Sequence, residues 1–234
     1  MAAYRLQKRC DEEAVFVVEG PKMCTEALRS GFGIRVVCAT DGSDEWRTEN
    51  GEFYEVSEAE LKRLSNMKTP NKVWMLVERS VKSVERRSEC ALTLALDRIQ
   101  DPGNMGTMLR TADWFGIRHV VCSRDTVSCY NPKVVQASMG AIFRTRVEYV
   151  DLPQWLASCR MPVYGATLAG MPLPEVELPH DDAVLLIGNE SRGISPEAMA
   201  QVTHPVLIPN RGGTAESLNA SVATGILIER LWNN

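Results

Sequence analysis

Short apolar runs alternate with amphipathic segments along the chain, and the first third already shows this alternation. The stretch EAELKRLSN has helical periodicity, with Ser57 as the expected N-cap and Glu60 at the capping-box position. Alternating strands and helices predict an α/β unit of about 80 residues. The segments expected in it are strands at 14–20, 34–40 and 72–78 and helices at 21–31 and 58–66.

The alternation restarts at Ala91, after a polar and highly charged stretch at 79–90 that predicts a linker. Beyond it, continuous apolar strands are separated by helices, which predicts a parallel sheet covered by helices on both faces. We therefore expect two domains, residues 1–85 and residues 91–234. The segments expected in the second are strands at 91–97, 118–123, 146–150, 163–167, 183–188 and 204–209 and helices at 103–116, 131–140, 152–158, 196–202 and 216–232.

The composition is that of an ordinary globular protein, with 44% hydrophobic and 24% charged residues in a chain of 234. Seven cysteines without a CxxC pair and three isolated histidines indicate a reducing compartment and no metal site. No apolar run has the length of a signal peptide or of a membrane span. We therefore expect a cytoplasmic protein with neither a metal nor a membrane partner.

The net charge of −4 hides an uneven distribution of charge. Residues 41–60 carry eight acids against one base, whereas residues 62–87 carry eight bases against two acids. Phosphates are bound by a local concentration of bases, whatever the sum over the chain. A solvated basic face without a partner is the alternative. The candidates for contacts with RNA phosphates are Lys62, Arg63, Lys68 and Lys72.

Ligands of open α/β sheets bind beyond the carboxyl ends of the strands, and three such ends here are polar and rich in glycine. In the first, at 96–116, a turn precedes a helix that begins with Asn104 and contains Gly106. Arg110 lies one helical turn after Gly106, so the two share a face. The stretch has neither a Walker A loop nor a GxGxxG fingerprint. A capped helix with an exposed arginine is the plain alternative.

The second strand end lies at 185–195, where Gly188 closes an apolar run and Asn189 and Glu190 follow. A carboxylate at this place accepts hydrogen bonds from a ligand or orients an arginine. The plain alternative is a loop with Gly193 as its hinge. This stretch is therefore a candidate wall of a binding site.

The third strand end, at 206–221, has a glycine-rich loop before a helix that is apolar on nearly every side. Its start gathers Glu216, Ser217 and Asn219. A single serine or asparagine is enough to cap a helix, and Ser217 is the expected cap. Asn219 and Glu216 then need another role, which points to a site at this helix start.

In this order and spacing, the three motifs resemble those of the SpoU-type RNA ribose 2′-O-methyltransferases, the TrmH-like family of the SPOUT superfamily. NMGTMLR is similar to the family's asparagine–glycine–arginine motif, GNESRG to its glycine–glutamate motif and IPNRGGTAESLN to its closing motif. QASMGAIFRTRV is also similar, and the resemblance covers about residues 91–234. The closing motif departs from the family in Asn210, where a methionine is usual, and in a loop one residue longer.

The stretch FVVEGPKMCTEAL resembles the substrate-binding domain of many family members, a small α/β fold like certain RNA-binding ribosomal proteins. The family resemblance implies that the last segments of the parallel sheet form a deep trefoil knot. It also implies a homodimer whose interface includes the final helix, and S-adenosylmethionine bound between the knot loops. The cofactor contacts that it implies are Thr167, Leu168, Gly188, Asn189, Ile208 and Leu218.

The reaction implied by the resemblance is methyl transfer to a ribose 2′-hydroxyl of RNA, without a metal. Arg110 resembles the family's catalytic arginine, and a guanidinium that stays protonated suits a phosphate or a developing alkoxide better than it suits a general base. Asn104 would orient Arg110 or the ribose, and Glu190 would position Arg110. Ser217 and Asn219 would line the site.

Ribosomal RNA is the expected substrate because of the separate N-terminal domain, and transfer RNA is the alternative. An RNA-binding protein without catalysis is a second class, against which the complete set of motif residues argues. A nucleotide-dependent Rossmann enzyme is a third, against which the absent phosphate-binding loop argues.

Overall fold

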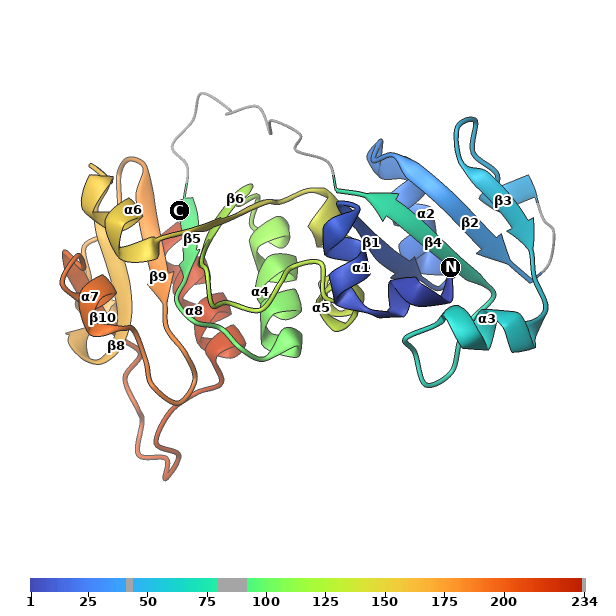
Figure 1. Cartoon of the computed structure of the whole chain (residues 1–234). Helices are drawn as coiled ribbons and strands as arrows, with labels where there is room; N and C mark the ends of the chain where they lie inside the picture. Colours follow the sequence, from blue (N-terminus) through green and yellow to red (C-terminus); the bar gives the residue numbers. More distant parts are fainter. Residues whose placement is uncertain (41–43, 80–91, 233–234) are drawn as a thin grey trace. The chain divides into compact units, whose positions relative to one another are not determined.

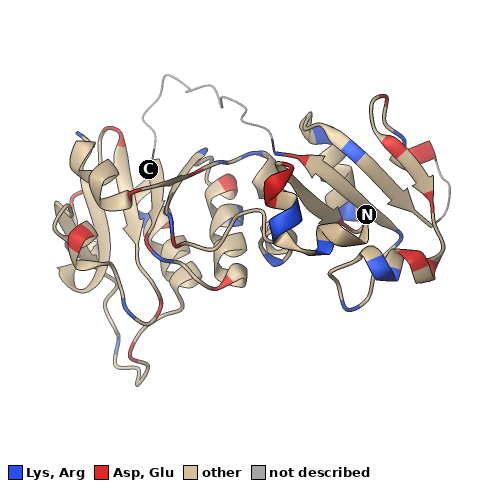
Figure 2. Cartoon of the chain, in the orientation of Figure 1, with Lys and Arg blue, Asp and Glu red and all other residues tan. Residues whose placement is uncertain are grey.

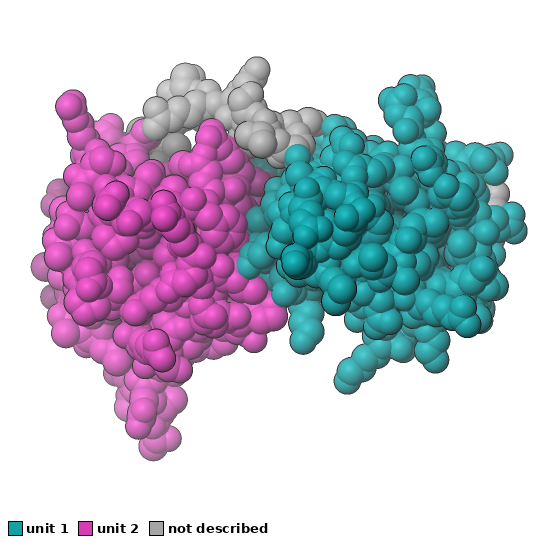
Figure 3. Space-filling model, in the orientation of Figure 1, with its two compact units in different colours: residues 1–82, 128–144 teal, residues 83–127, 145–234 magenta. Residues whose placement is uncertain are grey.

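The computed structural model describes residues 1–40, 44–79 and 92–232, which belong to two compact units (Figure 3). The first unit takes in residues 1–82 and 128–144, and the second takes in residues 83–127 and 145–234. The linker expected at 79–90 lies, apart from Arg79, outside the described residues.

In the described part of the first unit, four strands form a mixed sheet with the order β1-β4-β2-β3 (Figure 1). β4 runs antiparallel to both of its neighbours, and β2 and β3 are parallel. All five residues of β1 are buried, as expected of a strand covered on both faces. The strands are β1 (Val15–Glu19), β2 (Ile34–Ala39), β3 (Glu52–Glu55) and β4 (Val73–Glu78).

The helices of this unit begin and end at the signals present in the sequence. The predicted capping box is confirmed, because the Ser57 side chain accepts from the Glu60 amide and the Glu60 carboxylate accepts from the Ser57 amide. α2 starts at a proline and ends before Gly31, whose φ of 70° is left-handed. Neither α1 nor β3 was predicted from the sequence. The helices are α1 (Gln7–Glu12), α2 (Pro21–Ser30) and α3 (Glu58–Leu64).

A segment from the middle of the chain completes the first unit. α5 (Pro132–Ser138) lies against β1, and the 3-10 helix Ala141–Phe143 lies against α2 and α5. The ring of Phe16 lies 4.9 Å from that of Tyr130 and 6.0 Å from that of Phe143, between ring centroids. Burial of aromatic surface therefore holds this segment in place.

The second unit contains a parallel sheet with the order β10-β8-β9-β5-β6-β7, counted over its described residues (Figure 1). All of its strand pairs are parallel, which confirms the prediction. The central strands β5 and β9 are completely buried. The strands are β5 (Leu92–Leu96), β6 (His119–Ser123), β7 (Arg146–Val150), β8 (Val163–Pro172), β9 (Ala183–Ile187) and β10 (His204–Leu207).

Helices cover this sheet on both faces (Figure 1). On one face α6 and α7 contribute Leu152, Leu156 and Ala198 to an apolar cluster with side chains of the strands. On the other face α8 packs against α4 and β9. The helices are α4 (Pro102–Trp114), α6 (Leu152–Ser158), α7 (Pro196–Met199) and α8 (Ala220–Trp232).

The final helix starts later than the sequence predicted. It begins at Ala220 instead of residue 216, and the predicted cap Ser217 is wrong. Asn219 is the cap, because its Oδ1 accepts from the amide of Ser221 at 2.9 Å and from that of Val222 at 3.4 Å. No helix in the described part of the chain is long and apolar enough to span a bilayer.

Candidate active site

The three motifs lie beyond the carboxyl ends of neighbouring strands of the second unit. β8, β9 and β5 are adjacent, and β10 pairs with β8. Parallel strands end at the same edge of a sheet, so the loops after these strands share one edge. The motifs at 96–116, 185–195 and 206–221 are these loops or begin in them.

The loop after β9 folds back on itself. Asn189 and Gly193 exchange backbone hydrogen bonds of 3.0 and 2.8 Å. The turn passes so close to Gly188 that an added Cβ would lie 2.2 Å from the Ile194 nitrogen. Only glycine fits at position 188, because backbone atoms of Gly193 and Ile194 in the same loop occupy the space of a side chain.

Side chains from all three motifs form one hydrogen-bonded chain. Asn104 Nδ2 donates to Glu190 Oε1 at 2.7 Å, and Asn219 Nδ2 donates to Asn104 Oδ1 at 2.9 Å. Asn104 is in the first turn of α4, Glu190 follows β9, and Asn219 caps α8. Three segments far apart in the sequence therefore meet at one point.

The direction of this chain is fixed by its ends. An ionised carboxylate only accepts, so Asn104 must turn its NH₂ toward Glu190 and its oxygen toward Asn219. The NH₂ of Asn219 then faces Asn104, and its oxygen accepts from the first amides of α8. The positive end of a helix dipole thus lies behind a row of donors that ends on a carboxylate.

Arg110 and Ser217 do not join this chain. Asn104 and Arg110 are six positions apart on α4, so their side chains leave the helix about 120° apart. Both Arg110 and Ser217 are exposed, and neither forms a hydrogen bond or ion pair with a residue that the structure describes. The expected contact of Glu190 with Arg110 is replaced by its contact with Asn104.

The residues expected at the cofactor lie at the same sheet edge with apolar side chains exposed. β10 pairs Pro205 with Gly165 and Val206 with Met171, so the pairing passes over residues 166–170 of β8, which include Thr167 and Leu168. The side chains of Leu168 and Leu218 are 72% and 49% exposed. Ile208 is partly buried after β10. Exposed apolar groups beside a polar chain are suited to an amphipathic ligand.

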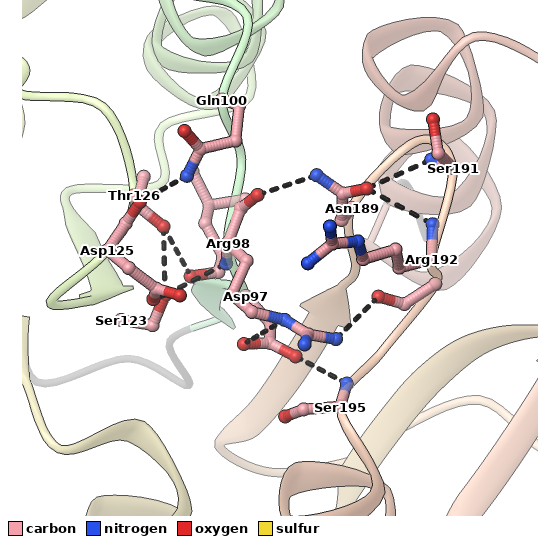
Figure 4. A network of polar contacts seen from close by, with 12 residues as sticks. Asp97, Arg98, Gln100, Ser123, Asp125, Thr126, Asn189, Ser191, Arg192 and Ser195 are labelled. Carbon is pink, nitrogen blue, oxygen red and sulfur yellow. Dashed lines mark hydrogen bonds and ion pairs between the residues drawn. The ribbon is translucent and has the colours of Figure 1, made fainter.

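The side chain of Asn189 serves the loop itself. Its Nδ2 donates to the Arg98 carbonyl at 2.9 Å, and its Oδ1 accepts from the amides of Ser191 and Arg192 at 3.0 and 3.1 Å (Figure 4). The backbone of Asn189 is likewise bonded to Gly193. The side chain of Asn189 is thus used within the loop, and its contact with a cofactor stays a prediction.

Sequence reasoning missed Asp97 and Arg98, which follow β5 and contact the loop after β9 (Figure 4). Asp97 is 2% exposed, although a buried carboxylate is uncommon without partners. Arg98 has a φ of 59°, which is rare for a residue with a side chain. A charged pair directly after an apolar strand is the one signal for these residues in the sequence.

The longer closing loop is organised by Asn210, the residue that departs from the family pattern. Its Oδ1 accepts from the amides of Gly212 and Gly213 at 2.9 and 2.7 Å. Its Nδ2 donates to the carbonyls of Gly213 and Ala215 at 3.0 and 3.3 Å. The side chain thus closes a small turn within the loop.

The candidate RNA-binding bases lie at the end of α3 and in the loop before β4 (Figure 2). All four are exposed, and none forms an ion pair with the part of the chain that the structure describes. Bases further along the run, at 82, 86 and 87, lie outside the described residues. The four are Lys62, Arg63, Lys68 and Lys72.

The start of this basic loop is tied to the sheet through Glu19, which is 7% exposed. Its carboxylate accepts from the Ser65 hydroxyl and, at 2.9 Å, from the Asn66 amide. Burial raises the pKa of Glu19, and these two hydrogen bonds oppose that rise. The loop thus begins from a fixed point.

Metal ligands do not gather in the described residues, where no three His, Cys, Asp or Glu side chains form a group that would hold an ion. Cys10, Cys24, Cys38 and Cys159 are free thiols. That the reaction needs no metal remains a prediction from the sequence.

A parallel α/β sheet with a polar site at the ends of its central strands defines a class of ligand-binding α/β proteins. Within that class, residues 91–229 match the SpoU rRNA methylase family, and the chain belongs to that family. Residues 1–74 match the MRM3-like substrate binding domain.

Relatives match the chain over nearly its whole length. It is 30% identical to the 23S rRNA (guanosine(2553)-2′-O)-methyltransferase RlmP of Bacillus subtilis, over 92% of this chain and 88% of that protein. It is similar to a solved structure from Porphyromonas gingivalis assigned to the TrmH family of RNA methyltransferases. The TM-score is 0.87 and the identity 38%, over 99% of this chain and 95% of that one.

An rRNA methyltransferase from Sinorhizobium meliloti, solved with AdoMet bound, is similar with a TM-score of 0.87. It is 28% identical, and the match covers 98% of this chain and 91% of that one. These matches therefore cover both the N-terminal unit and the unit with the parallel sheet.

Proposed function

We propose that this protein transfers a methyl group from S-adenosylmethionine (AdoMet) to a ribose 2′-hydroxyl of RNA, and that its substrate is ribosomal RNA. The observation that carries the proposal is the hydrogen-bonded chain of Glu190, Asn104 and Asn219, which joins the three family motifs. The preference for ribosomal over transfer RNA rests on relatives that share the N-terminal unit and carry rRNA in their names.

The cofactor would lie at the sheet edge formed by the ends of β8, β9 and β10. Its adenosine and methionine parts need apolar contacts and backbone partners, and the exposed Leu168 and Leu218 fit that need. AdoMet supplies an electrophilic methyl group when bound. Thr167, Gly188, Asn189 and Ile208 complete the proposed contacts.

The protein's own contribution is to hold the ribose and to stabilise the oxygen that accepts the methyl group. Oε1 of Glu190 is occupied by Asn104, and Oε2 has no partner among the described residues. That oxygen is free to accept a hydrogen bond from a hydroxyl of the ribose. Arg110 would bind the neighbouring phosphate and stabilise the developing alkoxide, and Ser217 would line the site beside Asn219.

We propose that the active protein is a homodimer formed through α4 and α8. Leu227, Ile228 and Leu231 of α8 are buried within the chain, so they offer no surface to a partner. Val222 and Ile226 of α8 stay exposed, as does Trp114 of α4, which is 85% exposed. These side chains share the outer sides of two packed helices, where a second copy would cover them.

Arg110 lies one turn before Trp114 on that same face of α4. Because the exposed side chains of α4 and α8 would be covered by a second copy, light scattering should find a dimer. Ile226→Glu, which places a charge on this surface, should weaken the dimer. An active monomer at assay concentration would contradict this part of the proposal. Packing of α8 against α4 and β9 supports the proposed trefoil knot, and thiols such as Cys10 and Cys24, which form no disulfide, suit a cytoplasmic location.

Residues 1–85 would capture RNA, and residues 91–234 would carry out the chemistry. Reversal of Lys62, Arg63, Lys68 and Lys72 to Glu should lower RNA affinity and reduce the slope of log affinity against log salt by about one per lost contact. AdoMet affinity should not change. Reversal of Lys8 and Arg29, exposed bases elsewhere in the first unit, is the control for a general effect of charge.

The central experiment incubates the full chain with methyl-labelled AdoMet and either ribosomal or transfer RNA. The label should enter ribosomal RNA, and the bond after the modified nucleotide should resist alkali, because alkaline cleavage needs a free 2′-oxygen. Asn104→Ala should abolish incorporation. Label in an alkali-sensitive nucleotide would refute ribose methylation, and AdoMet binding without transfer would indicate a silent RNA-binding protein.

A further inference from the structure

Asp97 lies directly after the central strand β5, and each of its two carboxylate oxygens contacts a different partner. Oδ2 accepts from the Ser195 amide at 2.6 Å, and Oδ1 lies 3.6 Å from Arg98 Nε. Its own amide donates to the Ile187 carbonyl at the end of β9. A carboxylate that is 2% exposed requires such partners, because a buried charge without them is strongly unfavourable.

Arg98 is held in its left-handed conformation by hydrogen bonds from both directions. Its amide donates to Ser123 Oγ at 2.8 Å, and its carbonyl accepts from Asn189 Nδ2 at 2.9 Å. Its guanidinium reaches the Gly193 carbonyl, with Nη2 at 3.4 Å from the oxygen. A non-glycine residue keeps such a backbone conformation only where its surroundings require it.

Ser123, which holds the Arg98 amide, ends β6 and forms further hydrogen bonds with the turn that follows β6. Ser123 Oγ, which accepts from Arg98, donates to Asp125 at 2.7 Å and lies 3.0 Å from Thr126 Oγ1. Thr126 Oγ1 donates in turn to the Leu96 carbonyl at 3.3 Å. The Asp97–Arg98 pair therefore rests on two strands of the sheet.

These contacts fix the loop after β9 at three points. Asn189 is held by the Arg98 carbonyl, Gly193 by the Arg98 guanidinium and Ser195 by the Asp97 carboxylate (Figure 4). Glu190 lies inside this fixed stretch, immediately after its first anchor, and its own side chain bonds to Asn104. The place of the Glu190 carboxylate is therefore set by contacts made through its neighbours.

We propose that Asp97 and Arg98 are positioning residues, which hold the 188–195 loop so that Glu190 meets Asn104. The inference rests on the proposed methyl transfer and names residues that act through Glu190 without touching the substrate. Glycine would occupy the left-handed position more easily than arginine does. The side chain of Arg98 therefore has a role other than forming the turn, and its guanidinium contacts both Asp97 and the Gly193 carbonyl of the loop.

The test combines kinetics with hydrogen exchange on the full chain. Arg98→Ala should lower kcat by about tenfold or more, with little change in KM for RNA. In a Glu190→Ala background the same change should cost less than about twofold, because residues that act as a unit are not additive. Arg98→Lys, which keeps a charge beside Asp97, should recover part of the loss.

Hydrogen exchange gives a readout that does not depend on activity. Amides of residues 189–195 should exchange about tenfold faster in Arg98→Ala than in the wild type. Asp97→Asn, which keeps an oxygen for the Ser195 amide but loses its charge, should show a smaller acceleration. Arg124→Ala is the matched control, since Arg124 is exposed in the neighbouring turn and forms no bond with the described residues.

Equal losses of kcat in the wild-type and Glu190→Ala backgrounds would overturn the inference, since they would show a role independent of Glu190. Unchanged exchange of the loop in Arg98→Ala would overturn it as well. A wild-type protein without methyl transfer would refute the proposed function instead. In that case the exchange result alone would still decide whether Asp97 and Arg98 hold the loop.

Discussion

Replacement of Gly188 by alanine should inactivate the protein without unfolding it. The added Cβ would lie 2.2 Å from the Ile194 nitrogen and 2.3 Å from the Gly193 carbonyl carbon, both of them backbone atoms. Ordinary contact begins at 3.4 Å, so the loop and β9 must separate by about 1 Å. No side-chain rotation relieves this overlap.

The consequence for the site follows from the hydrogen bond between Asn104 and Glu190. At 2.7 Å it is short, and a shift of about 1 Å lengthens it to about 3.7 Å, beyond the range of a hydrogen bond. A displacement of this size costs about 100-fold in rate when it affects reacting groups. Overpacking costs about 1–3 kcal/mol, which corresponds to about 2–12 °C in Tm for a chain of this size.

The assay is single-turnover methyl transfer together with thermal unfolding. Gly116→Ala is the matched control, because Gly116 has a φ of 74° and no atom within 4 Å of an added Cβ. It should lose about 1–2 kcal/mol of stability for its left-handed conformation and keep its activity. Activity of Gly188→Ala within threefold of the wild type, or an equal loss in Gly116→Ala, would refute the reasoning.

Arg110→Ala should lose at least about 100-fold in methyl transfer. Calorimetric AdoMet affinity should stay within about twofold, because Arg110 lies on α4 and the proposed cofactor contacts lie in the loops at the ends of β8, β9 and β10; wild-type turnover would exclude its catalytic role. Glu19→Gln should raise Tm relative to the wild type as the pH increases. Burial raises the pKa of Glu19, so the stability from its neutral form is complete below the unfolded pKa, about 4.3, and is lost as the pH passes the folded pKa. Parallel Tm curves of the two proteins from pH 4 to 8 would contradict this. Chelation should leave activity unchanged once RNA folding is controlled, and a loss restored by zinc alone would show a metal site.

Local chemistry made the elements of this protein predictable. The capping box of Ser57 and Glu60 depends on residues three positions apart, and it forms as expected. Apolar runs such as 92–96 and 183–187 are buried along their whole length, as expected of strands in a sheet covered on both faces. These features need no knowledge of distant partners.

The start of α8 shows where local signals became ambiguous. Ser217 and Asn219 are both good caps, and the sequence offered no reason to prefer the second. Asn219 also donates to Asn104, 115 positions away, and that bond fixes its side chain at the place where the cap is needed. A distant contact therefore chose between two locally equivalent residues.

The docking of α5 was equally invisible in the sequence. Its periodicity and its cap at Asn131 were predicted, but it packs against β1, more than a hundred positions earlier. An apolar helix face is satisfied by any apolar surface of suitable shape, so the pattern alone specifies no partner.

By itself, then, the sequence determined the strands other than β3, most helices, the parallel sheet and the three motifs that mark the family. Only the tertiary structure decided that Glu190 bonds to Asn104 and not to Arg110, and that Asp97 and Arg98 hold the loop between them. The physical reason is that secondary structure depends on propensity and periodicity over a few residues. Hydrogen bonds between strand ends depend on helix rotation and loop path, to within about an ångström, and packing of the whole unit sets both.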